Sequence, residues 1–144
     1  MIRAAAAFLR RHPYPVGGVY LFALFMTFAY MPYDFLLKPF WGGIDAAEEV
    51  WLGYRLRGWP AKLTEPAHWA IYASLAHGLH HERPWAWTFG SLYTVQVAVA
   101  SLVWVILYAD YGPVGYALTP VVVGLFLLLA LRLWQLRPSS SGDR

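Results

Sequence analysis

Residues 84–108 read PWAWTFGSLYTVQVAVASLVWVILY, and this stretch decides the class of the fold. It contains no charged side chain and only a few polar ones. A bilayer core ~30 Å thick is crossed by about 20 mostly apolar residues in a helix. We therefore predict a membrane-spanning helix over residues 84–108.

Three further apolar stretches accompany it, at residues 16–37, 66–80 and 114–134. The first and last have the length of a membrane span, whereas residues 66–80 are fewer and more polar. We predict an all-α integral membrane protein, a four-transmembrane-helix bundle formed by one membrane domain over residues 1–137. Residues 138–144 form a polar tail. The alternative is three spans, with residues 66–80 lying in the membrane interface.

The composition favours the same class of protein. Hydrophobic residues make up 59% of the chain and charged residues 13%, against about 25% charged residues in a typical soluble domain. Many of the 8 Trp and 10 Tyr residues stand near the ends of the apolar stretches, as in the aromatic belts of membrane proteins. The positive charges also stand at these ends, so the net charge of +3 gives no reason to expect a nucleic-acid partner.

The flanking charges predict the orientation of the chain. Arginines or histidines precede the first stretch, separate the second from the third, and close the fourth: Arg3, Arg10, Arg11, His12, His80, His81, Arg83, Arg132 and Arg137. With four spans, these regions share one side of the membrane. Positive residues concentrate on the cytoplasmic side, so we expect both termini to be cytoplasmic.

The loop between the first two spans predicts one more helix. From Ile44 to Leu56, apolar and charged residues fall on opposite faces at helical spacing. Asp45 and Glu48 have the spacing of a helix cap and its return acceptor. We expect a short amphipathic helix over residues 44–56, lying at the outer interface or over the mouth of the bundle.

Polar groups at membrane depth are the candidate site residues, because each is costly in lipid. The candidates for ligand binding are Asp34, Glu65, His68, Tyr72 and Gln96. Glu65 and His68 are also the candidates for catalysis, as an acid–base pair with each other or with Asp34. The structural alternatives are a headgroup position for Asp34, a helix-end hydrogen-bond cluster at Glu65, and an interhelical bond for Gln96.

We expect no metal or other cofactor. His77, His80 and His81 have the HxxHH spacing of membrane di-iron enzymes, but the chain has only five histidines in all. Such sites need about eight. The chain also has no cysteine, which excludes disulfides and thiolate metal sites.

The layout resembles the EXPERA superfamily, to which the emopamil-binding sterol isomerase and the sigma-two receptor belong. An acid near the end of the first span (Asp34), Glu65-Pro66 at the start of the second, the basic-aromatic turn at 82–85 and Pro120 in the last span carry this resemblance. It implies an apolar ligand cavity with acidic residues at its polar end.

We therefore expect a protein that binds a lipid, a sterol-like compound or an isoprenoid, with isomerisation by proton transfer as its chemistry if it is an enzyme. The cavity would open among the first three spans toward the outer side. The expected partners are membrane lipids, the apolar small molecule, and other membrane subunits or a second copy in a homodimer. The alternative function is that of a non-catalytic accessory or scaffold subunit of a larger membrane complex.

Overall fold

The computed structural model describes residues 2–12, 14–108 and 112–138, and these residues are mostly helical. A continuous helical N-terminal arm (Val16–Gly42) contains α2, two π-helical segments and α3. The elements in chain order are α1 (Ile2–Arg11), α2 (Val16–Phe25), the π-helical segments Met26–Tyr30 and Tyr33–Leu37, α3 (Lys38–Gly42), a 3₁₀ turn (Ile44–Ala46), β1 (Glu48–Trp51), β2 (Tyr54–Arg57), α4 (Trp59–His80), α5 (Pro84–Leu107) and α6 (Gly112–Gln135).

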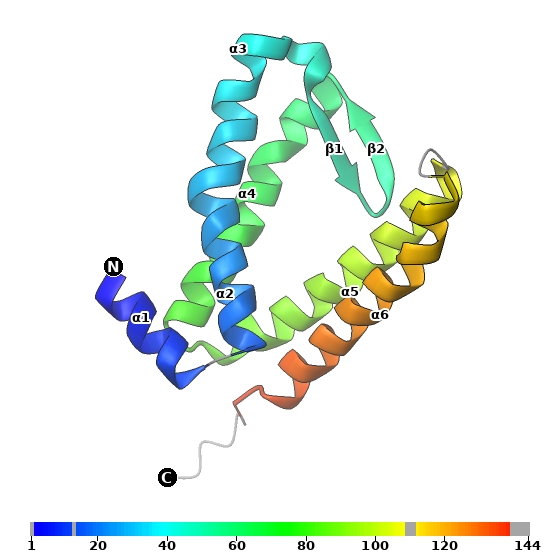
Figure 1. Cartoon of the computed structure of the whole chain (residues 1–144). Helices are drawn as coiled ribbons and strands as arrows, with labels where there is room; N and C mark the ends of the chain where they lie inside the picture. The colour runs from blue at the N-terminus through cyan, green and yellow to red at the C-terminus, as the bar shows by residue number, and fades with distance from the viewer. Residues whose placement is uncertain (1, 13, 109–111, 139–144) are drawn as a thin grey trace.

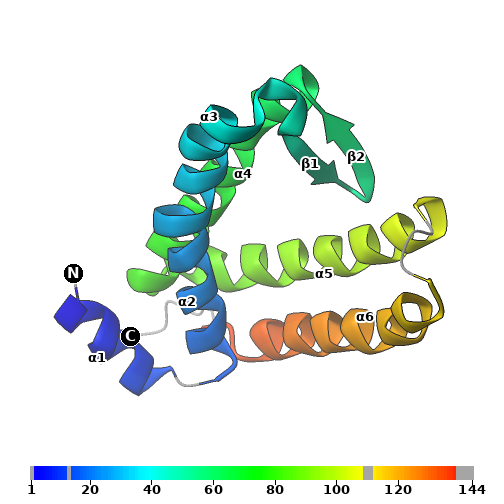
Figure 2. The same ribbon diagram turned by 45° about the horizontal axis from the view of Figure 1, so that its top comes forward.

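The long helices form two antiparallel pairs. The N-terminal arm packs along α4, and α5 packs along α6. The two pairs diverge from one end of the molecule, and the β1–β2 hairpin lies in the opening between them (Figures 1 and 2). The arrangement is therefore more open than the four-helix bundle that the sequence predicts.

The closed end of the molecule is one apolar core. Side chains from the N-terminal helices, α4, α5 and α6 are almost fully buried there: Phe8, Tyr20, Leu79, Trp87 and Leu133. This core brings the end of α1, the α4–α5 turn and the end of α6 together. We call this region the basic end, because most of the arginines stand around it.

Among the described residues, three helices are long and apolar enough to cross a membrane: Val16–Gly42, Pro84–Leu107 and Gly115–Gln135. They match the predicted first, third and fourth spans, although the first continues to Gly42 rather than ending at Leu37. The predicted start of the second was wrong, because α4 begins at Trp59, with Pro60 in its first turn. Proline fits the first turn of a helix, where its missing N–H has no helical partner to lose.

The predicted amphipathic helix over residues 44–56 was wrong. Residues 48–57 form an antiparallel hairpin in which Glu49 pairs with Leu56 and Trp51 with Tyr54. Leu52 and Gly53 form its two-residue turn with φ of 53° and 88°, and positive φ at both positions is the requirement of a type I′ turn. A Cβ on Gly53 would lie 2.4 Å from the Cβ of Val103 in α5, so this turn packs tightly against α5.

Two prolines explain how the N-terminal arm is joined to α4. In the π-helical segments, each N–H bonds to the carbonyl five residues earlier, as from Met31 to Met26. Pro32 has no N–H to continue this pattern, and the freed carbonyl of Thr27 instead accepts a bond of 2.9 Å from Trp69 Nε1.

Pro39 acts in the same way on the second π-helical segment. Its missing N–H leaves the carbonyl of Asp34, five residues earlier, without a helical donor. The carbonyls of Asp34 and Phe35 accept bonds of 3.2 and 2.6 Å from Lys62 Nζ. Buried carbonyls need a donor, so the proline positions determine where α4 can attach to the arm.

Candidate functional site

Three buried carboxylates meet near the open end of the molecule, and we call them the carboxylate cluster. Asp34 comes from the N-terminal arm, Glu49 from β1 and Glu65 from α4. One oxygen from each lies within 4.8 Å of the others, and all three residues are buried. Carboxylates so close together repel one another strongly in a medium of low dielectric constant, so they require nearby positive charge.

Two lysines supply most of that charge. Lys38 Nζ lies 2.7 Å from Asp34 Oδ1, one helical turn along the arm. Lys62 Nζ lies 2.7 Å from Glu65 Oε2, and it also donates to the carbonyls of Asp34 and Phe35. Lys62 therefore has two roles: it forms a buried ion pair with Glu65, and its bonds to the carbonyls attach α4 to the arm.

The carboxylate cluster has one negative charge more than its two ammonium groups neutralise. His68 is the third basic group at the cluster, since its Nδ1 lies 2.6 Å from Glu49 Oε2. The second oxygen of Glu65, Oε1, is buried and receives no hydrogen bond from the described residues. Although three carboxylates can ligate a hard cation, the lysines already serve as counterions here.

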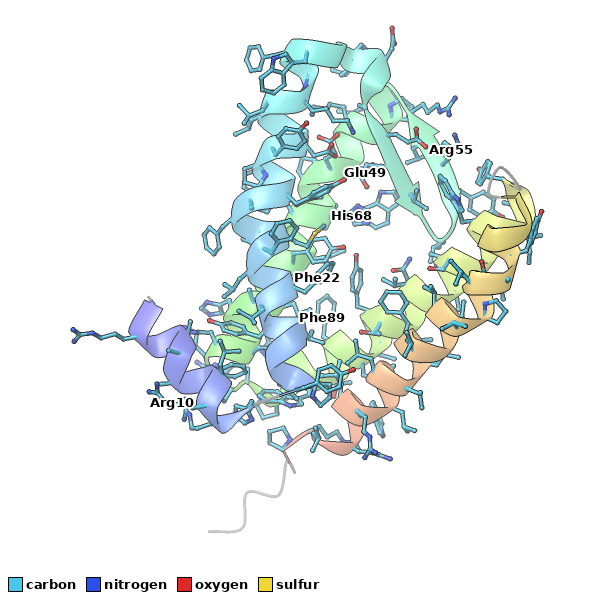
Figure 3. All side chains as sticks on the ribbon, in the orientation of Figure 1. Arg10, Phe22, Glu49, Arg55, His68 and Phe89 are labelled. Atoms are coloured by element: carbon cyan, nitrogen blue, oxygen red, sulfur yellow. The ribbon has the colours of Figure 1, made fainter. Side chains whose placement is uncertain are left out.

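His68 is held in a defined orientation. Besides its bond to Glu49, its ring stacks on the indole of Trp51, with centroids 3.9 Å apart and planes 4° from parallel. Glu49 and Trp51 are alternate residues of β1, so they lie on the same face of the hairpin. Figure 3 shows Glu49 and His68 between the N-terminal arm and the hairpin.

The other face of the hairpin contacts α5. The guanidinium of Arg55 lies 4.8 Å from the ring centroids of both Trp104 and Tyr108, and the Arg55 N–H donates to the Tyr108 hydroxyl. The hairpin thus acts as a wedge between the two helix pairs, with the carboxylate cluster beside one of its faces.

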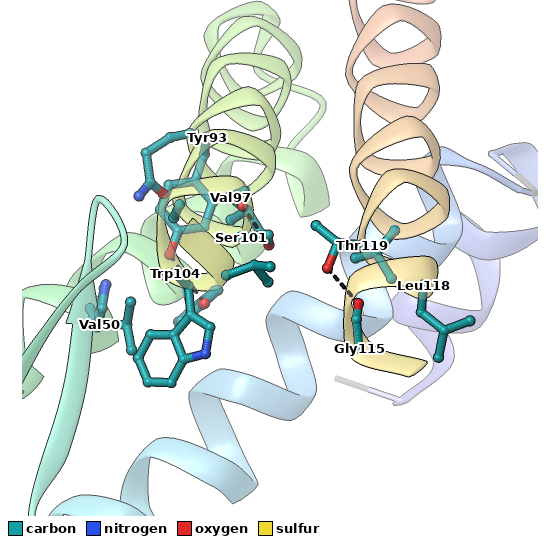
Figure 4. A pocket seen from close by; sticks show the side chains of 14 residues that line it. Val50, Tyr93, Val97, Ser101, Trp104, Gly115, Leu118 and Thr119 are labelled. Atoms are coloured by element: carbon teal, nitrogen blue, oxygen red, sulfur yellow. Dashed lines mark hydrogen bonds between the residues drawn. The ribbon is translucent and has the colours of Figure 1, made fainter. Parts of the chain in front are cut away.

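A cavity of about 570 Å³ lies in the opening that the wedge maintains. Figure 4 shows Val50 of the hairpin on one side, Val97 and Trp104 of α5 behind, and Thr119 of α6 opposite. Most of its wall is apolar. Its polar groups are His68, Tyr72, Tyr93 and Gln96, with Ser101 and Thr119 bonded to carbonyls of their own helices.

The polar end of this cavity is partly connected by hydrogen bonds. The hydroxyl of Tyr93 donates to that of Tyr72 at 3.1 Å, and the Tyr72 ring lies 6.4 Å from the ring of His68. Gln96 lines the same cavity and makes no side-chain hydrogen bond to another described residue. His68 therefore belongs to both compartments: it bonds to the carboxylate cluster and lines the cavity.

The structure places the predicted residues in two groups rather than one. Asp34 and Glu65 meet in the carboxylate cluster, whereas His68, Tyr72 and Gln96 line the cavity. The predicted pairing of His68 with Glu65 or Asp34 was wrong, because His68 bonds to Glu49. The predicted location of the cavity, among the first three spans, was also wrong. The cavity is lined by residues of β1, α4, α5 and α6, and no residue of the arm lines it.

Glu49 is the site residue that the sequence reasoning missed. The assumed helix over 44–56 placed it on a solvated face, so its burial was not foreseen. The signal was a two-residue turn containing Gly53 between Val50-Trp51 and Tyr54, which are residues that favour strands. As a strand, residues 48–51 place Glu49 and Trp51 on one face.

At the basic end, the three histidines with the HxxHH spacing lie close together. The His77 and His81 rings lie 4.4 Å apart, and the His80 and His81 rings 5.1 Å apart. Tyr20 and His80 Nδ1 form a hydrogen bond of 2.7 Å. Partial desolvation, and then the positive charges of His77, His80 and Arg83, lower the pKa of His81.

Comparison with known protein families, curated proteins and solved structures finds no match. The function is therefore argued from the geometry of this chain.

Proposed function

We propose that this chain is an integral membrane protein that binds an apolar molecule, such as a lipid, a sterol-like compound or an isoprenoid, in the cavity between the hairpin, α4, α5 and α6. The cavity itself carries the proposal: about 570 Å³ of space with a largely apolar wall and polar groups at one end. Sites for small molecules commonly have this size and this combination of an apolar wall with a few polar groups.

In this proposal α4 is the fourth membrane crossing. Its 22 residues extend over roughly 33 Å at 1.5 Å per residue, which is enough for a bilayer core. It runs antiparallel to the N-terminal arm, and the arm, α5 and α6 are long and apolar enough to cross. Four crossings return the chain to the side on which it began, and the arginines of the basic end favour the cytoplasmic side for both termini.

The polar end of the cavity favours a ligand with a neutral head that can form hydrogen bonds. The hydroxyls of Tyr72 and Tyr93 and the amide of Gln96 can bond to an alcohol or a carbonyl group. The negative charge of the adjacent carboxylate cluster opposes an anionic head. An apolar body would then lie against Val97, Val122 and the other aliphatic residues of α5 and α6.

Isomerisation by proton transfer is the chemistry that this site could carry out. Glu49 fixes the ring of His68 through Nδ1, and an imidazole held by a carboxylate can give or accept a proton near neutral pH. Glu65 would act as part of the charged surroundings, not as the direct partner of His68. The resemblance to the EXPERA superfamily implies acids at the polar end of a ligand cavity; here the acids lie beside that end, and His68, which lines the cavity, bonds to one of them.

The test compares two valines of α5. Val97 lines the cavity, whereas Val95 is exposed on the same helix and does not. The full chain and the variants Val97→Phe and Val95→Phe are purified in detergent, and the bound compounds are extracted with organic solvent and identified by mass spectrometry. We expect one apolar compound in stoichiometric amount in the parent and in Val95→Phe, and at least a fivefold loss in Val97→Phe.

Two outcomes would contradict the proposal. One is a folded, monodisperse parent protein that carries no such compound, and the other is an equal amount in both variants. Folding only when a neighbouring membrane protein is co-expressed would favour the alternative of an accessory subunit, in which the same polar groups would pair across subunits.

A further inference from the structure

A second hollow, separate from the cavity, lies between the N-terminal arm and α4. Its volume is about 290 Å³, and we call it the arm groove. The residues that line it are Tyr20, Leu24, Thr27 and Phe28 on the arm and Ala73, Ala76, His77 and His80 on α4. None of them lines the larger cavity, so this inference rests on the proposed membrane setting but not on a ligand in that cavity.

The arm groove has an apolar end and a polar end. Phe28 and Ala73 stand at one end, toward the middle of the two helices, and Tyr20 and His80 at the other. The seven residue steps from Ala73 to His80 correspond to a rise of roughly 10 Å along α4. Its aliphatic and aromatic walls suit a hydrocarbon chain lying along the pair of helices.

The polar end opens at the basic end of the molecule. His77 lines the groove, its ring lies 4.4 Å from that of His81, and Arg83 follows in the turn after α4. All three side chains belong to exposed residues, and none of them has an ion pair with a described acid. They remain available to an anion from outside the chain.

The single acid close to these residues in the described chain is already engaged. Glu82 Oε1 lies 2.8 Å from Arg11 Nη1 and 3.5 Å from His12 Nε2. It therefore does not neutralise Arg83 or the histidines. Desolvation, and then the nearby positive charge of His77, His80 and Arg83, lower the pKa of His81, and a bound phosphate would offset the electrostatic part of this effect.

We propose that an anionic phospholipid binds at the arm groove, with an acyl chain between the arm and α4 and its phosphate against His77, His81 and Arg83. Charged hydrogen bonds from arginine and imidazolium suit phosphate oxygens. Basic pockets between helices on the cytoplasmic side are a known way of binding anionic headgroups. An apolar groove that ends in a basic cluster fits such an amphiphile better than a free anion.

The test uses the full chain in a neutral detergent. Its thermal unfolding is followed while phosphatidylglycerol, phosphatidylcholine or inorganic phosphate is added, and the affinities are compared with those of Arg83→Gln, Ala73→Phe and Arg10→Gln. Arg10 is the matched control, because it is exposed on α1 and points away from the rest of the molecule (Figure 3). ¹³C-labelled histidine NMR follows His81 in the parent protein.

We expect phosphatidylglycerol to stabilise the parent protein and phosphatidylcholine to have at most a fifth of that effect. Arg83→Gln and Ala73→Phe should each weaken phosphatidylglycerol binding at least fivefold, with Arg10→Gln unchanged. The pKa of His81 should rise when phosphatidylglycerol binds. If a variant does not fold, the comparison of lipids and the NMR titration, both made on the parent protein, still test whether the anionic lipid binds here.

Three results would overturn the proposal. Equal stabilisation by both lipids would show a groove without headgroup selection. An equal effect of inorganic phosphate, undiminished in Ala73→Phe, would show a free-anion site. An equal loss in Arg10→Gln and Arg83→Gln would show a diffuse attraction to charge.

Discussion

The two ends of this molecule treat charge in opposite ways. At the open end, Asp34, Glu49 and Glu65 are buried and are paired with Lys38, Lys62 and His68. At the basic end, the arginines are exposed, and the ion pair of Arg11 with Glu82 lies at the surface. Burial of a charge is unfavourable without a partner, whereas an exposed charge needs none. The paired charges of the open end therefore hold the arm, β1 and α4 in fixed positions, whereas the exposed charges of the basic end can interact with groups outside the chain.

The largest expected effect comes from removing a buried partner. Lys62→Met leaves the buried Glu65 without its counterion, and it leaves the carbonyls of Asp34 and Phe35 without their donor. Breaking a buried pair from one side typically costs about 3–5 kcal/mol, and we expect a loss in this range. The free energy of unfolding is measured by SDS titration in mixed micelles with circular dichroism.

Arg57→Met is the matched control for that prediction. The Arg57 side chain is 64% exposed, and its contact with Glu48 is at the surface, so we expect a loss below about 1 kcal/mol. Equal losses for Lys62→Met and Arg57→Met would mean that the open end is as hydrated as a surface.

The hairpin wedge is tested by Gly53→Ala. The added Cβ would lie 2.4 Å from the Val103 Cβ, so the turn must move away from α5. Gly43 also has a positive φ, but a Cβ there meets nothing within 4 Å. We expect Gly53→Ala to lose about 2 kcal/mol more than Gly43→Ala, the usual cost of overpacking. A similar loss for both variants, in the same SDS titration, would show that the wedge is not tightly seated.

A much smaller effect is expected at the basic end. Arg11→Gln removes an ion pair whose side chains are 61% and 37% exposed. Such pairs contribute about 0–1 kcal/mol, so the free energy of unfolding should change by less than that. A loss comparable to that of Lys62→Met would place the basic end in a drier environment than its exposure indicates.

The smallest predicted change is a shift in the titration of His81. Desolvation and the neighbouring cations lower its pKa, so ¹³C-histidine NMR should find its midpoint below that of an ordinary histidine. Arg83→Gln removes one of these cations and should move the midpoint upward. A downward or absent shift would show that Arg83 does not act on His81.

Hydropathy and length were enough to predict three of the long helices, because the cost of exposing backbone groups to lipid leaves few alternatives to a helix. The start of α4 was not predicted, because the apolar stretch that predicts this helix begins only at residue 66, whereas the helix begins at Trp59. The hairpin was also missed. The apolar residues in 44–56 have helical spacing, but the same segment contains a turn at Leu52-Gly53. The segment forms the hairpin that this turn favours, not the helix.

The candidate site shows a second limit of sequence reasoning. Asp34, Glu65 and His68 could be selected one by one, because each is a polar group placed near lipid. Which of them meet depends on the rotation of each helix, and that rotation follows from contacts distant in the chain. The bonds from Lys62 and Trp69 to carbonyls freed by Pro39 and Pro32 fix the arm against α4, and β1 then brings Glu49 to His68.

The most direct test of the central claim, an apolar molecule held beside the carboxylate cluster, is photolabelling of the full chain in liposomes. The probe is an isoprenoid alcohol carrying a diazirine, and the labelled peptides are mapped by mass spectrometry. We expect labelling on the cavity face of α5, at residues 97–105, to be competed by excess unlabelled alcohol and to be lost in Val97→Phe. Labelling spread over the lipid-facing surfaces, unaffected by competitor or by Val97→Phe, would contradict the claim.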